Sequence, residues 1–115
     1  MKTIHEQATV SYTQEQMYDL VSDVERYPEF LPFCTHGELL SSSADVDVSR
    51  LDFGIQGLSY SLTTKNSKSF PAAFDMKLLE GPFRIFHALW QFSSQDTGAR
   101  ISVACEFELS SRTAM

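Results

Sequence analysis

Basic residues and cysteines are scarce in this sequence of 115 residues. Nine lysines and arginines stand against fifteen aspartates and glutamates, which gives a formal net charge of −6. Because general nucleic-acid binders and anionic-membrane binders place Lys and Arg against phosphate groups, this balance argues against both classes, DNA binding included. The two cysteines, Cys34 and Cys105, form no CxxC motif. We therefore expect reduced, buried thiols in a cytoplasmic protein.

Long hydrophobic runs are also absent. No stretch approaches the ~18 apolar residues of a membrane-spanning helix, and the N-terminus, MKTIHEQATV, lacks the apolar core of a signal peptide. Apolar residues nevertheless make up 43% of the chain and charged residues 21%, which is typical of a globular protein. The length fits one domain with a core of useful size.

Motifs for catalysis or metal binding are missing as well. His5, His36 and His87 lack the spacing of metal ligands, so surface or strand-end positions are the better interpretation. Cys34 could act as a nucleophile beside a histidine, but a buried structural thiol is favoured because no neighbour obviously lowers its pKa. No phosphate-binding glycine loop or GxSxG motif is present. We predict no catalytic residue, no metal site and no enzymatic activity.

The first part of the chain combines a strand and a helix. In residues 3–12 mostly apolar side chains alternate with polar ones, and several of these residues are β-branched. This pattern predicts a β-strand. Thr13 and Gln16 form a capping box that predicts a helix start. Pro28 ends regular helix. One buried stripe of the helix is indicated by four apolar residues at helical spacing: Met17, Leu20, Val21 and Val24.

The remainder of the chain is predicted to be β-structure. Short turns at 41–43, 54, 65–71, 81–82 and 96–98 separate about six strands. The strands are expected at residues 37–40, 45–53, 57–64, 74–78, 83–92 and 101–109, with Val46 and Val48 on one side of the second. Strands joined by short turns favour an antiparallel meander, and such a sheet can keep one face apolar.

That apolar face is too large for the first helix to cover. Its predicted members are Leu58, Tyr60, Leu62, Phe74, Met76, Phe86, Trp90, Phe92, Val103 and Phe107. Four stripe residues of one helix cannot cover strands of ~10 residues, which are about 33 Å long. A further element, a ligand, a partner or self-association must therefore cover the remaining part of the face.

Residues 27–33 are predicted to form a rigid apolar plug. Tyr27, Phe30, Leu31 and Phe33 stand around Pro28 and Pro32, whose rings restrict the local backbone. Such a segment caps a hollow or forms an interface, and an ordinary core turn is the alternative.

The stretch from Met17 to Cys34, MYDLVSDVERYPEFLPFC, resembles the signature of the coenzyme Q-binding START-like family, in the polyketide cyclase/dehydrase and lipid-transport group. Weaker resemblances lie at residues 51–54, 78–83, 89–92 and 105–109. The resemblance implies an α+β helix-grip fold, with a curved antiparallel sheet of about seven strands and N-terminal helices. Members continue into a long C-terminal helix. We expect one START-like domain over residues 1–115, shortened at its C-terminal end and missing that helix.

The resemblance implies a lipid-binding module that holds ubiquinone or a similar isoprenoid in an apolar cavity and supports respiration, with no resident cofactor. The alternative is a toxin that binds the large ribosomal subunit and blocks subunit association, because some bacterial members do so. The expected ligand-binding residues belong to the apolar face and the plug: Phe30, Phe33, Phe53, Tyr60, Leu62, Phe74, Met76, Phe86, Trp90, Phe92 and Val103.

Overall fold

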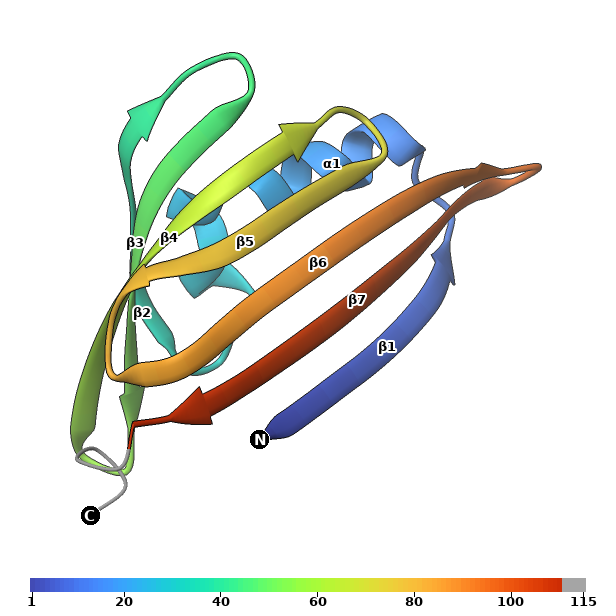
Figure 1. The fold of residues 1–115 in the computed structure, drawn as a ribbon. Coiled ribbons are helices and arrows are strands. Elements are labelled where there is room, and N and C mark those ends of the chain that lie inside the picture. Colours follow the sequence, from blue (N-terminus) through green and yellow to red (C-terminus); the bar gives the residue numbers. More distant parts are fainter. Residues whose placement is uncertain (111–115) are drawn as a thin grey trace.

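A curved antiparallel sheet wraps around two short helices (Figure 1). The computed structural model describes residues 1–110, apart from the side chain of Ile55. Within this range the elements are β1 (Lys2–Val10), α1 (Gln14–Ser22), the 3₁₀-helix η1 (Val24–Glu29), β2 (Cys34–Ser42), β3 (Val46–Ile55), β4 (Leu58–Ser69), β5 (Ala73–Glu80), β6 (Phe83–Gln95) and β7 (Gly98–Leu109). The strand order β1-β7-β6-β5-β4-β3-β2 is antiparallel throughout. The predicted α+β class and seven-stranded sheet are confirmed, whereas the end at 111–115 lies outside the described residues.

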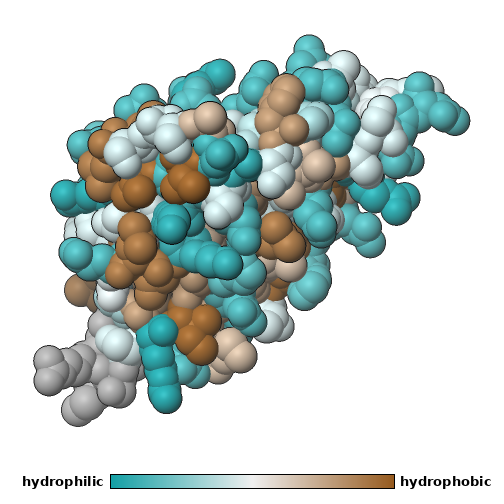
Figure 2. Space-filling view, turned by 45° about the horizontal axis from the view of Figure 1, so that its top comes forward, coloured by the Kyte–Doolittle hydropathy of each residue, from teal (hydrophilic) through white to brown (hydrophobic). Residues whose placement is uncertain are grey.

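Hydrophobic residues are unevenly distributed on the face seen in Figure 2. In Figure 2 the tip formed by the β6–β7 hairpin, at the right, is mostly hydrophilic, and brown residues concentrate over the other half. In the described part of the chain no helix is both long enough and apolar enough to cross a membrane.

Helix α1 begins as the sequence predicts. The Gln16 amide donates to Thr13 Oγ1 at 3.1 Å, and the Thr13 amide donates to Gln16 Oε1 at 2.8 Å, which completes the capping box. The predicted stripe is only partly right, because Tyr18 is a buried residue of this helix whereas Met17 and Leu20 are not fully buried. Aromatic contacts explain the difference: the Tyr18 ring packs edge-on against Phe70, Phe74 and Phe92, with centroids 5.1, 6.1 and 5.7 Å away.

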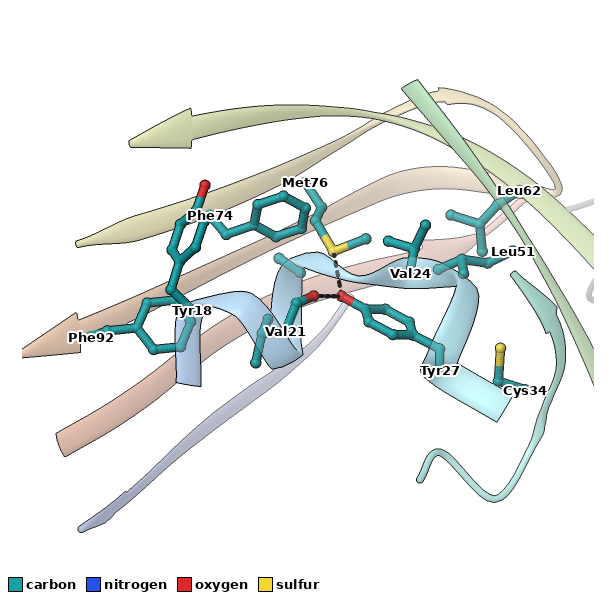
Figure 3. Packing of buried hydrophobic residues seen from close by; sticks show 11 residues of the cluster. Tyr18, Val21, Val24, Tyr27, Cys34, Leu51, Leu62, Phe74, Met76 and Phe92 are labelled. Carbon is teal, nitrogen blue, oxygen red and sulfur yellow. Dashed lines mark hydrogen bonds between the residues drawn. The ribbon is translucent and has the colours of Figure 1, made fainter. Parts of the chain in front are cut away.

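The 3₁₀-helix is anchored by Tyr27, which is buried against the sheet (Figure 3). Its hydroxyl donates to the Val21 carbonyl and lies 3.9 Å from Met76 Sδ. Strand β2 then passes so close that a Cβ on Gly37 would lie 2.0 Å from the Val24 carbonyl oxygen. Only glycine permits this contact between η1 and β2.

The plug is not buried as a unit. Tyr27 is 4% exposed, but the Phe30 and Phe33 side chains are 43% and 57% exposed. The reason is local: the Tyr27 ring occupies the space beneath η1, and the chain after it runs along the surface until Cys34 enters β2. The alternative of an ordinary core turn is therefore wrong for Phe30 and Phe33.

Buried polar side chains explain why two strand predictions were wrong. Residues 65–69 belong to β4 rather than to a turn, because Asn66 is fully buried and its Nδ2 donates to Ser49 Oγ at 2.9 Å. Thr64 Oγ1 donates to Asn66 Oδ1 at 2.7 Å and lies 3.1 Å from Ser49 Oγ. In β3 the buried face accordingly carries Asp47, Ser49 and Leu51, not the valines at 46 and 48. Buried hydroxyls and amides are tolerated when they bond to one another in this way.

The β3–β4 turn also lies two residues later than predicted. Gln56 and Gly57 have φ values of 51° and 81°, typical of a two-residue hairpin turn, and Gly54 remains in β3. This shift extends β3 past Phe53 to Ile55, so the hairpin end that carries the pocket described next lies beyond the Phe53–Tyr60 pair.

Candidate functional site

An apolar pocket of about 430 Å³ lies at the end of the sheet that carries the β3–β4 hairpin. Its walls are the hairpin on one side and the start of β6 with the end of β7 on the other. Cross-strand pairing brings the walls onto one face, since Phe53 is opposite Tyr60 and Phe86 is opposite Phe107. The lining residues are Phe53, Gln56, Leu58, Tyr60, Leu62, Phe83, Phe86, Cys105, Phe107 and Leu109.

A β-bulge places Phe83 in the pocket. Phe83 pairs with Leu109, Ile85 with Glu108 and Phe86 with Phe107, so one extra residue in β6 interrupts the alternation. Phe83 and Phe86 therefore share a face although they are three residues apart, and their ring centroids are 5.5 Å apart. Strict period-two reasoning would have placed Phe83 on the other face, which is why sequence reasoning missed it.

Four of the predicted ligand-binding residues come together in this pocket: Phe53, Tyr60, Leu62 and Phe86. Another group lies elsewhere on the same face of the sheet. Phe74, Met76 and Phe92 are buried in the core beneath α1, and Trp90 packs against that core (Figure 3 shows the first three). Val103 pairs with Trp90 and is half-buried outside the pocket lining.

The sequence pattern indicated some, but not all, of the remaining lining residues. Leu58 and Phe107 belong to the predicted apolar face, and Cys105 and Leu109 continue the apolar row of the last strand. Gln56 is the exception, because its place in the lining depends on the hairpin turn, which was predicted at the wrong residue. The signal that could have found these residues is cross-strand register, which a single strand's pattern does not contain.

The chemistry of the pocket is that of an uncharged surface. None of its lining residues carries a formal charge, and five of them are aromatic. The Cys105 thiol at its wall stays protonated, because burial raises its pKa. The nearby Asp52 carboxylate lies on the other face, where the Ser61 hydroxyl donates to it and holds its pKa below the usual value. Within residues 1–110 no three His, Cys, Asp or Glu side chains are grouped to hold a metal ion.

A second hollow, of about 550 Å³, lies between the end of β1 and α1. Val10, Met17 and Leu20 contribute apolar surface to it. Asp19, Asp23 and Arg26 make its margin charged, so it is less suited to an apolar ligand than the pocket.

Comparison with known proteins places this geometry in a family. Residues 10–115 match the polyketide cyclase/dehydrase and lipid transport family. The chain belongs to this family. It is 38% identical over 113 residues to the ribosome association toxin RatA of Vibrio cholerae serotype O1, covering 97% of this chain and 78% of that protein. It is also 37% identical over 49 residues to the coenzyme Q-binding protein COQ10 homolog B, mitochondrial, of Xenopus laevis, covering 43% of this chain and 20% of that protein.

Solved structures share the fold of this chain. The protein TTHA0849 from Thermus thermophilus superposes with a TM-score of 0.86 at 17% identity, over 95% of this chain and 75% of that one. The Zhui aromatase/cyclase from Streptomyces sp. R1128 superposes with a TM-score of 0.83 at 18% identity, over 96% and 69%. At these identities the likeness concerns the fold alone. The family match over residues 10–115 confirms the START-like resemblance read from the sequence.

Proposed function

We propose that this chain is a lipid-binding module that holds an isoprenoid quinone, or a lipid of similar shape, in the apolar pocket. The observation that carries the proposal is the pocket lining, which is uncharged and rich in aromatic rings. Its volume of about 430 Å³ falls within the roughly 300–1,000 Å³ of small-molecule sites. The match to a coenzyme Q-binding protein supports the quinone as ligand, and with it a role in respiration. This match covers only part of the chain.

We propose that the chain binds its ligand in the cytoplasm and does not catalyse a reaction. Tyr60, Gln56 and Cys105 are the polar side chains of the pocket, and they suffice to orient a head group by hydrogen bonds.

Self-association through the uncovered part of the sheet face belongs to the same proposal. Light scattering of the purified chain tests it, and a monodisperse monomer would remove it.

The ligand is tested by titration with a short-chain, water-soluble ubiquinone. Trp90 is the one tryptophan of the sequence and lies in β6, the strand that contributes Phe83 and Phe86 to the pocket, so we use its fluorescence to report binding. We expect saturable quenching in the parent chain. Leu58→Asp, at a lining residue that is 59% exposed, should weaken binding by about tenfold or more, because the carboxylate must be desolvated against the ligand.

Leu40→Asp is the matched control, since Leu40 is 48% exposed in β2 and lies outside the pocket lining. Its affinity should equal that of the parent. A folded parent chain without saturable quenching, or equal losses in both variants, would contradict the proposal.

A second candidate function is association with the large ribosomal subunit, in the manner of a toxin that blocks subunit joining. It is favoured by the identity to the ribosome association toxin RatA across nearly the whole chain. The exposed rings of Phe30 and Phe33 could serve as its contact surface. Co-sedimentation with separated ribosomal subunits tests it: retention by the large subunit supports it, and absence from both subunit fractions removes it.

A further inference from the structure

Strand β1 forms an open edge of the sheet (Figure 1). Within residues 1–110 it stands at one end of the strand order and has β7 as its neighbour on one side only. All nine of its residues pair with β7 in one continuous register, and eight of the nine are exposed. Its outer row of backbone amide and carbonyl groups can therefore pair with a further strand.

The opposite edge of the sheet is less suited to such pairing. Strand β2 pairs with β3 with register shifts between Cys34 and His36 and between Leu39 and Ser41. Bulges of this kind twist an edge strand and hinder its pairing with another chain. Strand β1 contains neither a register shift nor a proline. Of the two edges, β1 is thus the one that can accept another strand along its length.

The side chains of β1 carry opposite charges on one face. Ile4 pairs with Cys105 of the pocket lining, so the even-numbered residues of β1 lie on the concave face of the sheet. Lys2 and Glu6 lie on this face, two residues before and two residues after Ile4. Within residues 1–110 neither of them takes part in a salt bridge. Ile4, which is 43% exposed, thus stands between a cation and an anion.

We propose that β1 pairs antiparallel with β1 of a second copy of this chain, with a two-fold axis midway between the two Ile4 residues. An axis perpendicular to the sheet keeps both concave faces on one side, so even-numbered residues lie opposite even-numbered residues. In the register centred on Ile4, Lys2 of each copy lies opposite Glu6 of the other, and the two Ile4 side chains meet. A register centred on Glu6 would oppose two carboxylates, and one centred on His5 would place Ile4 opposite Glu6.

The contact is short and separate from the pocket. Residues 2–6 of each copy form it, so we expect a weak, reversible dimer. The two ion pairs select the register, and mutual burial of the Ile4 side chains adds to the affinity. None of these five residues lines the pocket, so the interface does not depend on the proposed lipid binding. It is also distinct from self-association through the apolar face of the sheet.

Sedimentation velocity of the purified chain, from about 10 μM to about 1 mM, covers the affinities of weak interfaces and tests the proposal. We expect a monomer–dimer equilibrium in the parent. Lys2→Glu and Glu6→Lys should each raise the dimer dissociation constant by about tenfold or more, because each turns two ion pairs into two like-charge contacts. The double variant exchanges the charges and should dimerise like the parent. An equimolar mixture of the two single variants should do the same, since both ion pairs form again between unlike copies.

Lys65→Glu is the matched control. Lys65 is exposed in β4, inside the sheet and away from β1, and its substitution changes the net charge as Lys2→Glu does. This variant should dimerise like the parent. Circular dichroism checks that each variant folds, which we expect because Lys2 and Glu6 are both exposed.

Three results would overturn the proposal. The parent could stay monomeric over the whole concentration range. Lys2→Glu and Glu6→Lys could dimerise no less than Lys65→Glu, which would assign the association to another surface. The double variant and the equimolar mixture could both stay monomeric while folded, which would show that Lys2 and Glu6 do not face each other. Quinone titration of Lys2→Glu remains readable in each case, and loss of quinone binding leaves the sedimentation result readable.

Discussion

Two equally buried tyrosines should respond in opposite ways to loss of their hydroxyl groups. Tyr18 and Tyr27 are each 4% exposed, and both lie between the helices and the sheet. The Tyr27 hydroxyl donates to the Val21 carbonyl, whereas the Tyr18 hydroxyl has no hydrogen-bond partner within residues 1–110. Burial, followed by the nearby Asp47 carboxylate, raises the pKa of Tyr18, so the group is a neutral and unpaired hydroxyl.

Tyr18→Phe should stabilise the protein by about 1 kcal/mol. A buried polar group without a partner costs ~1–3 kcal/mol relative to water, and the substitution removes that cost. The ring contacts with Phe70, Phe74 and Phe92 are retained, since they involve only carbon atoms. We take the low end of the range because the lost oxygen leaves a small void.

Tyr27→Phe should destabilise the protein by about 1–2 kcal/mol. Val21 lies in the last turn of α1, where carbonyls lack a partner within the helix, and the Tyr27 hydroxyl supplies one. Removing the hydroxyl leaves that carbonyl buried without this donor.

Urea unfolding followed by circular dichroism measures both effects. With a slope of about 2 kcal/mol/M, a change of ~1 kcal/mol moves the midpoint by about 0.5 M. The midpoint should rise for Tyr18→Phe and fall for Tyr27→Phe. If both variants are destabilised alike, the Tyr18 hydroxyl has a partner such as a buried water molecule, and the reasoning is refuted.

Three further changes test other parts of the structure. Gly37→Ala should cost about 2 kcal/mol or more, because its Cβ would lie 2.0 Å from the Val24 carbonyl oxygen; a parent-like urea midpoint would show that β2 and η1 can separate freely. Burial raises the pKa of Cys105, so iodoacetamide should label the native thiol slowly near its ordinary pKa of ~8.5 and faster only at higher pH; labelling as fast as a free thiol would contradict this. The Ser61 hydrogen bond lowers the pKa of Asp52 in the folded state, so this group stabilises the fold above its unfolded pKa of ~3.9 and less as the pH falls through the folded value. Ser61→Ala should reduce that acid-side loss, measured as urea midpoints at neutral and acidic pH, and an unchanged pH dependence would count against it.

Much of the apolar face of the sheet was predictable because β5 and the part of β6 after its bulge keep a strict alternation. Phe86, Trp90 and Phe92 share a face with Phe74 and Met76, as expected from their parity. Burial on one side of a sheet produces this alternation, so the pattern survives in the sequence. The capping box of α1 was predictable for a similar reason, since it is a contact between residues three apart.

Features that depend on contacts between distant segments were not predictable. The hydroxyl and amide groups of Ser49, Thr64 and Asn66 look like turn or surface groups until β3 and β4 are paired. The bulge that turns Phe83 into the pocket has no marker in β6 alone. The pocket therefore could be predicted as an apolar face, but its position at the hairpin end could not.

The central claim is that the pocket at the β3–β4 hairpin holds an apolar ligand. Amide chemical-shift mapping on addition of a short-chain ubiquinone tests it most directly, because it reports position as well as binding. We predict that the largest shifts fall at residues 53–60, 83–86 and 105–109, which surround the pocket, and that α1 is little affected. Saturable shifts centred instead on residues 10–26, around the hollow beside α1, or no shifts at all, would contradict the account.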